Sequence, residues 1–174
     1  SRLRGRTPEQ AGTVLAVNLH GDRPFGAVYR VSPRGRAEAR GLAAQAGGHV
    51  QDFLGSDLSS NALFKAVSAA QPTAWSGRLL STQSGALVVG VAHRDAGGHV
   101  LIGEVPPAVL LDDLRSVAGE DAAMVWVVDG SGEVLADTEG RYMGRLNLHN
   151  WPLLQAALQG RPVPADFEFE RRPM

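Results

Sequence analysis

Apolar residues form short runs and alternating patterns along the first third of the chain, and these patterns predict strands and helices. The segment Thr13 to Leu19 is apolar and rich in residues that favour strands, and turn-forming residues follow it at Gly21 and Pro24. Gly26 to Ser32 is a second segment of this kind, so the two predict a hairpin. Arg36 to Phe53 is rich in alanine and predicts a helix.

The middle of the chain predicts a helix followed by three strands. Ser59, Ser60 and Asn61 are N-cap residue types before the helical segment Ala62 to Ala70, and Pro72 ends that segment. Three apolar segments separated by short turns then predict an antiparallel meander. These segments are Trp75 to Thr82, Ala86 to His93 and Val100 to Val105.

The last third predicts a helix, a hairpin, a second helix and a strand. Ala108 to Val117 has a helical pattern after two prolines. The hairpin begins at Met124 and turns at Asp129 to Gly132, where two glycines separate two apolar runs. A helix from Trp151 to Leu158 and an alternating strand from Ala165 to Glu170 follow.

Three features recur in the same order, the last two about 90 residues apart, and they indicate an internal repeat. They are an apolar strand (Val14 to Asn18, Val125 to Asp129), an aromatic–apolar–glycine triplet ending at Gly55 or Gly144, and a tetrapeptide that begins with leucine and ends with alanine (Leu63 to Ala66, Leu153 to Ala156). In both copies a proline follows the alanine of the tetrapeptide by six residues. Chance would explain each element alone, but the preserved order favours duplication.

The element order predicts an α+β fold with two tandem PAS-like modules, each an antiparallel sheet with flanking helices. We expect residues 1–12 to be the remnant of an N-terminal helix or linker and residues 13–105 to form the first module. Residues 106–120 should be a connecting helix, and residues 121–174 an incomplete second module, because the chain stops after what would be its third strand.

Composition excludes several classes of protein. The 174 residues are 44% hydrophobic, which is enough for a real core, and the net charge of −1 leaves no basic face for nucleic acid. The chain has no cysteine, so disulfides, thiolate metal sites and thiol nucleophiles are excluded. No apolar run approaches the roughly 20 residues of a membrane span, and no leader-like segment is present.

No catalytic pattern emerges. The five histidines are widely spread, and no pair has the spacing of metal ligands. Asp112 and Asp113 are adjacent on a predicted helix and would point about 100° apart. The turn at Asp129 to Gly132 lacks the further acidic positions of a calcium loop and the ending of a phosphate-binding loop. We therefore expect a protein that is not an enzyme and that holds no metal or cofactor.

Several stretches resemble the double Cache domains of bacterial receptors. The hairpin VWVVDGSGEVLADTEGRYMG is similar to the membrane-proximal hairpin of that family, and AWSGRLLSTQSGALVVGVAH with the helix AVLLDDL is similar to its membrane-distal module. The resemblance covers the chain from about Thr13 onward. Family members usually open with a longer helix and complete the second module with more strands and a helix.

The resemblance implies a location and a function. Family members lie outside the cytoplasmic membrane as sensor domains of histidine kinases, chemoreceptors and cyclic-di-nucleotide enzymes, and they bind small molecules in the distal module. We therefore expect a periplasmic ligand-sensing domain of a transmembrane receptor. Its ligand would be an unidentified metabolite. A homodimer with a second copy of the chain is also compatible with the resemblance. The membrane would be reached only through flanking spans outside this chain.

Five residues are candidates for ligand contact, in a cavity between the sheet and the covering helices. They are Phe64, Trp75, Arg78, His93 and Glu104. Trp75 would stack on a ligand, and Arg78 would bind a carboxylate with its bidentate fork. His93 and Glu104 lie near strand ends, and the resemblance adds that amino-acid-binding relatives carry an acidic residue near the position of Glu104. Thr73 replaces the arginine of the family's amino-acid motif, which argues against a free amino acid.

Ordinary structural roles compete with four of these assignments. Trp75 could be a core aromatic residue, and Arg78, His93 and Glu104 could be solvated. The whole chain could also be a structural or dimerisation module whose cavity is filled by its own side chains. A cytoplasmic PAS or GAF-like domain with a bound haem or flavin is a third option, which absorbance of the purified protein would reveal.

Overall fold

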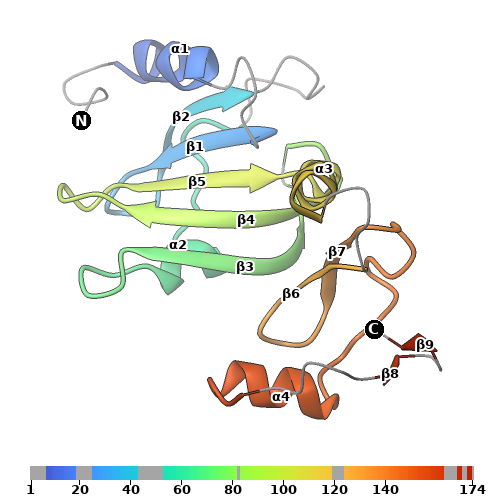
Figure 1. Cartoon of the computed structure of the whole chain (residues 1–174). Coiled ribbons are helices and arrows are strands. Elements are labelled where there is room, and N and C mark those ends of the chain that lie inside the picture. Colours follow the sequence, from blue (N-terminus) through green and yellow to red (C-terminus); the bar gives the residue numbers. More distant parts are fainter. Residues whose placement is uncertain are drawn as a thin grey trace. The chain divides into compact units, whose positions relative to one another are not determined.

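Five antiparallel strands form the main sheet of the structure, a computed structural model, in the order β2-β1-β5-β4-β3 (Figure 1). The structure describes residues 7–18, 25–42, 53–81, 83–118, 124–162, 168–169 and 172–173. They fall into two units, Ser1–Pro106 and Pro107–Met174. The sheet belongs to the first unit, and its strands are β1 (Ala27–Val31), β2 (Ala37–Leu42), β3 (Thr73–Leu80), β4 (Leu87–Arg94) and β5 (Val100–Val105). The predicted α+β class and the predicted three-strand meander are confirmed.

The first element is a helix, α1 (Pro8–Asn18), so the strand predicted from Thr13 onward is wrong; Leu19 lies outside the described residues. Thr7 and Gln10 form a capping box, in which each side-chain oxygen accepts a hydrogen bond from the backbone N–H of the other residue at 3.3 and 3.2 Å. Pro8 occupies the first helical position, where its missing N–H costs nothing. These local signals outweigh the strand preference of the residues that follow.

Strand β2 replaces most of the described part of the alanine-rich helix predicted from Arg36; residues 43–52 of that segment lie outside the described residues. Arg30 pairs with Ala39 and Val31 with Ala37, so the register shifts between them. This shift puts Ala37 in the larger core on one face of the sheet and Ala39 against α1 on the other. Pairing with β1 overrides the helix preference of alanine. Small residues are required here because α1 packs closely: a Cβ added to Gly12 would lie 3.0 Å from the carbonyl oxygen of Arg40.

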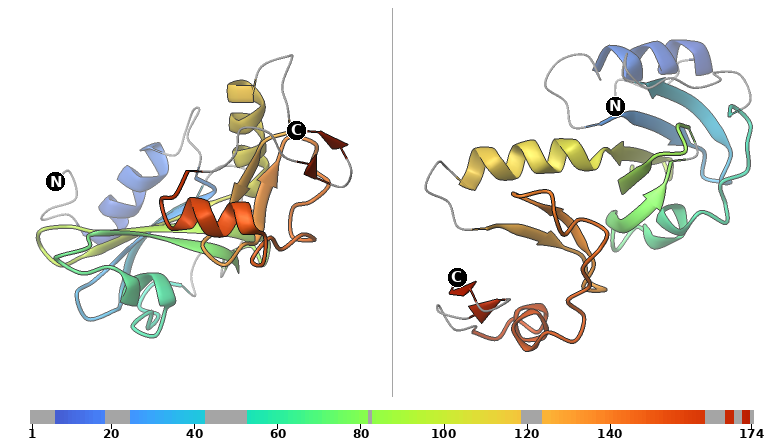
Figure 2. Two further views of the ribbon diagram at one scale, coloured as in Figure 1. Left: turned by 60° about the horizontal axis from the view of Figure 1, so that its bottom comes forward. Right: turned by 90° about the vertical axis from the view of Figure 1, so that its right-hand side faces the viewer.

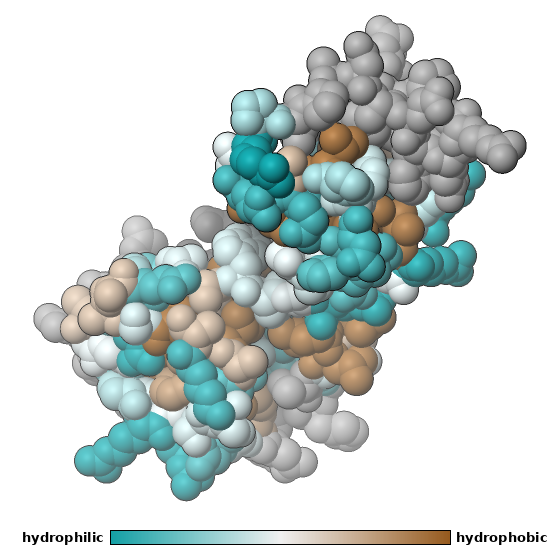
Figure 3. All heavy atoms as spheres, turned by 90° about the horizontal axis from the view of Figure 1, so that it is seen from below, coloured by the Kyte–Doolittle hydropathy of each residue, from teal (hydrophilic) through white to brown (hydrophobic). Residues whose placement is uncertain are grey.

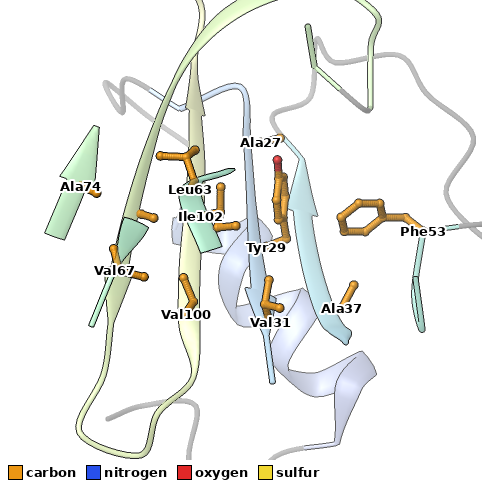
Figure 4. Packing of buried hydrophobic residues seen from close by; sticks show 11 residues of the cluster. Ala27, Tyr29, Val31, Ala37, Phe53, Leu63, Val67, Ala74, Val100 and Ile102 are labelled. Atoms are coloured by element: carbon orange, nitrogen blue, oxygen red, sulfur yellow. The ribbon is translucent and has the colours of Figure 1, made fainter. Parts of the chain in front are cut away.

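Helices cover both faces of the sheet (Figure 2, left). Ala11 and Leu15 of α1 pack on Ala39 at one face. The other face carries the larger core, where side chains from the strands meet the short helix α2 (Ala62–Ala66) and the segment that precedes it (Figure 4). The buried members of this core are Ala27, Tyr29, Val31, Ala37, Phe53, Leu63, Val67, Ala74, Ala92, Val100 and Ile102.

Helix α2 begins as predicted at the N-cap Asn61, but it ends at Ala66, before the predicted end at Ala70. Val67 already has extended backbone angles and is buried in the core. The carbonyl of Val67 accepts a hydrogen bond from Nε of Arg94 at 3.1 Å, which fixes the end of the helix against β4. A favourable burial site for Val67 therefore ends the helix earlier than the sequence pattern indicates.

The second unit contains the hairpin β6–β7 and two helices that are longer than α2. These elements agree with those predicted from the sequence. The hairpin turns at Asp129 to Gly132, and Arg115 donates a hydrogen bond from Nε to the carbonyl of Thr138 at 3.4 Å. The elements are α3 (Pro107–Ala118), β6 (Trp126–Val128), β7 (Val134–Asp137), α4 (Pro152–Leu158), β8 (Glu168–Phe169) and β9 (Arg172–Pro173). Of the strand predicted from Ala165 to Glu170, only β8 lies within the described residues.

The same backbone hydrogen bonds occur after the first hairpin of each unit. In the first unit, the backbone N–H groups of Gly35, Leu58 and Gly55 donate to the carbonyls of Ser32, Gly35 and Ala37, respectively. In the second unit, the corresponding donors Gly132, Leu148 and Gly144 bind the carbonyls of Asp129, Gly132 and Val134. The strand pair β1–β2 therefore corresponds to β6–β7. The predicted match of Val14 to Asn18 with Val125 to Asp129 is wrong, because the first of these segments lies in α1.

Glycine is required at the turn of both hairpins. Gly35 and Gly132 have φ angles of +82° and +87°, and a Cβ on either would lie within 3.0 Å of the chain that passes beside it. The close neighbours are Ser59 for the first glycine and His149 for the second. Each turn therefore packs closely against the segment that directly precedes the next helix of its unit.

Candidate functional site

A cavity of about 190 Å³ lies between α2 and the sheet face that carries the larger core. Its lining residues come from β1, the start of α2, and strands β3, β4 and β5; they are Tyr29, Asn61, Ala62, Leu63, Ser76, Leu79, Leu80, Gly90 and Glu104. Leu80 lines the cavity and is also exposed, so it marks the mouth. Ligand cavities usually measure about 300–1,000 Å³, so this one suits a guest of few atoms.

Glu104 supplies the carboxyl group of the cavity. It lies on β5 and is only 3% exposed. Tyr29 donates its hydroxyl to Oε1, and Ser81 donates its hydroxyl to Oε2, both at 2.6 Å. Distances of this length are typical of a hydroxyl bound to a carboxylate. The carboxyl group is therefore held from two sides, by β1 and by the end of β3.

Ser81 is oriented by the turn that follows it. Its Oγ accepts hydrogen bonds from the backbone N–H groups of Gln83 and Ser84, both at 3.0 Å. Since these donors occupy the hydroxyl oxygen, the hydroxyl proton is left to point toward Glu104. The turn between β3 and β4 thus helps to fix the carboxyl group in the cavity.

Burial of Glu104 favours a positively charged or N–H-donating guest. None of the described ion pairs includes this residue. A buried carboxylate without a cationic partner is costly, even when hydroxyl groups solvate it. A guest that brings a cation or N–H donors to Glu104 would offset part of this cost.

A β-bulge shapes the wall opposite α2. Trp75 pairs with Val91 and Arg78 pairs with Val89, so Ser76 and Gly77 together oppose Gly90. The Ser76 hydroxyl accepts a hydrogen bond from the Gly90 N–H at 2.8 Å and donates to the Gly77 carbonyl at 2.6 Å. These bonds satisfy backbone groups that the bulge would leave without partners.

Asn61 places an amide at the edge of the cavity. Its Oδ1 accepts the N–H groups of Leu63 and Phe64 at 2.9 and 3.2 Å, as an N-cap does. Because the oxygen is engaged, the amide nitrogen is the atom that could donate to a guest. The cavity therefore offers an acceptor at Glu104, a donor at Asn61 and apolar walls from its leucines.

Of the five residues predicted to contact a ligand, Glu104 lines this cavity, and the other four are not among its described lining residues. Trp75 is 64% exposed beside the bulge. Phe64 packs beside the core with the guanidinium of Arg94 at 5.5 Å from its ring centre. His93 Nδ1 lies 3.0 Å from Oγ1 of Thr73, and Arg78 is half-buried. The bulge interrupts the regular two-residue alternation of side chains along β3.

Sequence reasoning missed Tyr29 and Asn61, which line the cavity, and Ser81, which binds Glu104. Tyr29 stood in a predicted strand and Asn61 at a predicted N-cap, so each had an adequate structural explanation. Only the pairing of β1 with β5 brings Tyr29 next to the strand of Glu104. Tyr29 and Glu104 are both polar side chains in mostly apolar strands, and this shared feature could have indicated their contact.

Two further findings concern metal ions and membrane spans. In the described ranges, no three histidine or acidic side chains lie close enough together to hold a metal ion. None of the described helices has the length and apolar character needed to cross a membrane.

Comparison with known proteins shows the fold. The sequence matches no protein-family model and no curated protein. Among solved structures, the extracellular domain of rpHK1S-Z16, described as a histidine kinase, has a TM-score of 0.70 at 16% identity, covering 94% of this chain and 66% of that one.

Two chemoreceptor domains are also similar. The ligand-binding domain of Pseudomonas fluorescens CtaA with L-isoleucine has a TM-score of 0.61 at 13% identity, covering 95% of this chain and 66% of that one. The ligand-binding domain of Pseudomonas aeruginosa PAO1 PctB with L-Gln has a TM-score of 0.60 at 16% identity, covering 86% and 60%. This chain thus has the fold of extracellular and ligand-binding sensor domains and spans about two thirds of their length or less.

Proposed function

We propose that this chain is the ligand-sensing part of a bacterial transmembrane receptor, located in the periplasm, and that it binds a small molecule in the cavity at Glu104. The observation that carries the proposal is a buried carboxyl group, held by two hydroxyls, at the wall of a cavity between the sheet and a helix. The likeness to sensor domains of chemoreceptors and of a histidine kinase supports it. The role is binding, without a reaction.

The ligand is a small molecule with a cationic amine or similar N–H donor and a short apolar body. Glu104 would accept a hydrogen bond from this N–H donor, and Asn61 would bind a polar atom of the ligand nearer the edge of the cavity. Leu63 and Leu79 would contact the apolar part. The solved domains of CtaA and PctB hold amino acids, which also carry an amino group.

The two units are two copies of one module. Support comes from the shared hydrogen bonds of the two hairpins and corners. Glu104 lies three residues before Pro107, the first residue of α3 and of the second unit. A shift of β5 on ligand binding would reach the second unit through two consecutive prolines, whose backbone is stiff. The output would be a population change between two states.

Thermal-shift screening of the whole chain against amines, amino acids and organic acids tests the proposal. A ligand at one hundred times its Kd should add about 2.7 kcal/mol of stability. The Glu104→Gln variant should lose the response, and Asp113→Asn, which changes an exposed acid in the second unit, should keep it. A response that survives Glu104→Gln unchanged would remove this cavity from consideration.

A second function is a structural or dimerisation module whose cavity is filled by its own side chains. The small cavity volume favours it, because about 190 Å³ lies below the range of most ligand sites. If no compound of the panel stabilises the chain and the chain forms a stable dimer in solution, this alternative is supported.

A further inference from the structure

Gly90 lies at the floor of the cavity, and its missing side chain has a specific consequence. It pairs with Glu104 across β4 and β5. A Cβ at this position would lie 2.4 Å from Cδ1 of Leu63 and 3.1 Å from Cδ2 of Leu79. A methyl group of Leu63 therefore occupies the space above Gly90. Glycine within a strand often marks such a close approach.

Leu63 is held in this place from both ends of its helix. Asn61 caps the start of α2 by accepting hydrogen bonds from the N–H groups of Leu63 and Phe64. At the other end, Arg94 binds the carbonyl of Val67 through Nε and the carbonyl of Gly98 through a terminal nitrogen at 3.0 Å. Leu63 itself is 3% exposed. The contacts at both ends of α2 therefore hold the Leu63 backbone in place beside Gly90.

We infer that Leu63, seated on Gly90, is the residue that limits the size of the ligand beside Glu104. This rests on the proposed function, in which the ligand's amino group binds Glu104. The apolar part of such a ligand extends from Glu104 toward Gly90, where it meets the Leu63 side chain. Removal of the Leu63 side chain beyond Cβ lengthens the space, and a methyl group at position 90 refills it.

A series of straight-chain alkylammonium ions, from methyl to octyl, tests the size limit by thermal shift. The wild-type chain should respond to the short members and stop responding at a defined length. Leu63→Ala should move that cut-off by two or more carbons, and Leu63→Ala with Gly90→Ala should bring it back toward the wild-type length. Leu87→Ala is the matched control, because Leu87 lies on β4, is exposed and does not line the cavity.

Xenon binding measures the size of the cavity with an uncharged probe, which does not depend on Glu104. Apolar cavities take up xenon when they are large enough. Leu63→Ala should bind xenon several-fold more tightly than Leu87→Ala, and equal affinities together with an unmoved cut-off would overturn the inference. Should Leu63→Ala fail to fold, Leu63→Val gives the same comparison, with a smaller shift expected.

Failure of the proposed function has a different signature. If no alkylammonium ion stabilises the wild-type chain, the amine-binding role is wrong, and the xenon comparison alone decides the size limit. If the ions bind and Glu104→Gln abolishes binding, but Leu63→Ala leaves both cut-off and xenon affinity unchanged, only the size limit is wrong.

Discussion

Tyr29 and Glu104 form a hydrogen bond of 2.6 Å that joins β1 to β5 at the wall of the cavity. Their Cα positions are not directly paired, since Ala27 pairs with Glu104 and Tyr29 with Ile102. The bond therefore runs diagonally on the face of the sheet that carries the larger core, where the ring of Tyr29 also contacts Phe53 at 5.0 Å between centres. One residue thus supports both the core and the polar site.

Tyr29→Phe should keep the packing and remove the hydroxyl. A buried hydrogen bond to a charged group contributes about 1.5–3 kcal/mol, so the free energy of unfolding should fall by about 2 kcal/mol in urea titration. In a Glu104→Gln background the same change should cost less, because the charged acceptor is gone. Equal costs in both backgrounds would mean that the bond contributes nothing specific.

Thr7→Ala should weaken the start of α1. The capping box satisfies two N–H groups, and loss of an N-cap costs about 1 kcal/mol. The loss should appear in urea titration and as faster hydrogen exchange in α1. Thr7→Ser keeps a capping hydroxyl and should behave as the wild type; an equal loss in the serine variant would rule out the capping box as the cause.

Asp137→Asn should loosen the loop after β7 in the second unit. Asp137 is 1% exposed, and its two oxygens accept the N–H groups of Arg141, Tyr142 and Met143, each at 2.9 Å. An asparagine keeps one acceptor oxygen, so at least one bond is lost, at a cost of about 1–3 kcal/mol. Hydrogen exchange of these three amides measures the change directly. Asp113→Asn, at an exposed site, should leave their exchange unaltered.

Asp57 should give a pH-dependent contribution to stability. The backbone N–H of Ser59 binds its carboxylate at 2.9 Å and lowers the pKa of Asp57, with smaller contributions from the Ser59 side chain and the charge of Arg36. A group with a lowered pKa in the folded state stabilises the fold above its unfolded pKa, about 3.9, and loses this effect as pH falls through the folded pKa.

Asp57→Asn tests this contribution by comparison with the wild type between pH 7 and pH 2. The difference in unfolding free energy should be constant near neutral pH, shrink below about pH 4 and vanish in stronger acid. High salt should reduce it, because Asp57 is fully exposed. Asn147 already makes the equivalent bond to His149 in the second unit, so the amide should fit. A pH-independent difference would contradict the assignment.

Exposed apolar side chains do not by themselves define another site. Leu54, Trp75, Leu80, Leu87, Met143 and Leu158 are the exposed large hydrophobic residues of the described chain. On the face seen in Figure 3, apolar residues lie among hydrophilic ones. Scattered apolar exposure of this kind is normal for a folded protein.

The amino-acid sequence by itself determined the elements whose signals are local. The three strands from Thr73 to Val105 alternate or run apolar between glycine turns, and the hairpin at Asp129 to Gly132 has two glycines at its turn. Asn61 was recognisable as an N-cap because the interaction spans only three residues. Glu104 could be chosen as a site residue because it lies near the end of a predicted strand and because of the family resemblance.

Tertiary structure decided what depends on residues distant in the chain. Strand β2 forms because β1 and α1 hold small residues in place, although alanine alone favours a helix. The face of β3 is set by a bulge opposite Gly90, which a regular two-residue period does not predict. Tyr29 and Ser81 reach Glu104 across 75 and 23 residues of sequence. The cavity exists only where these separate strands and α2 meet, because its walls are contacts between segments and no single segment encodes them.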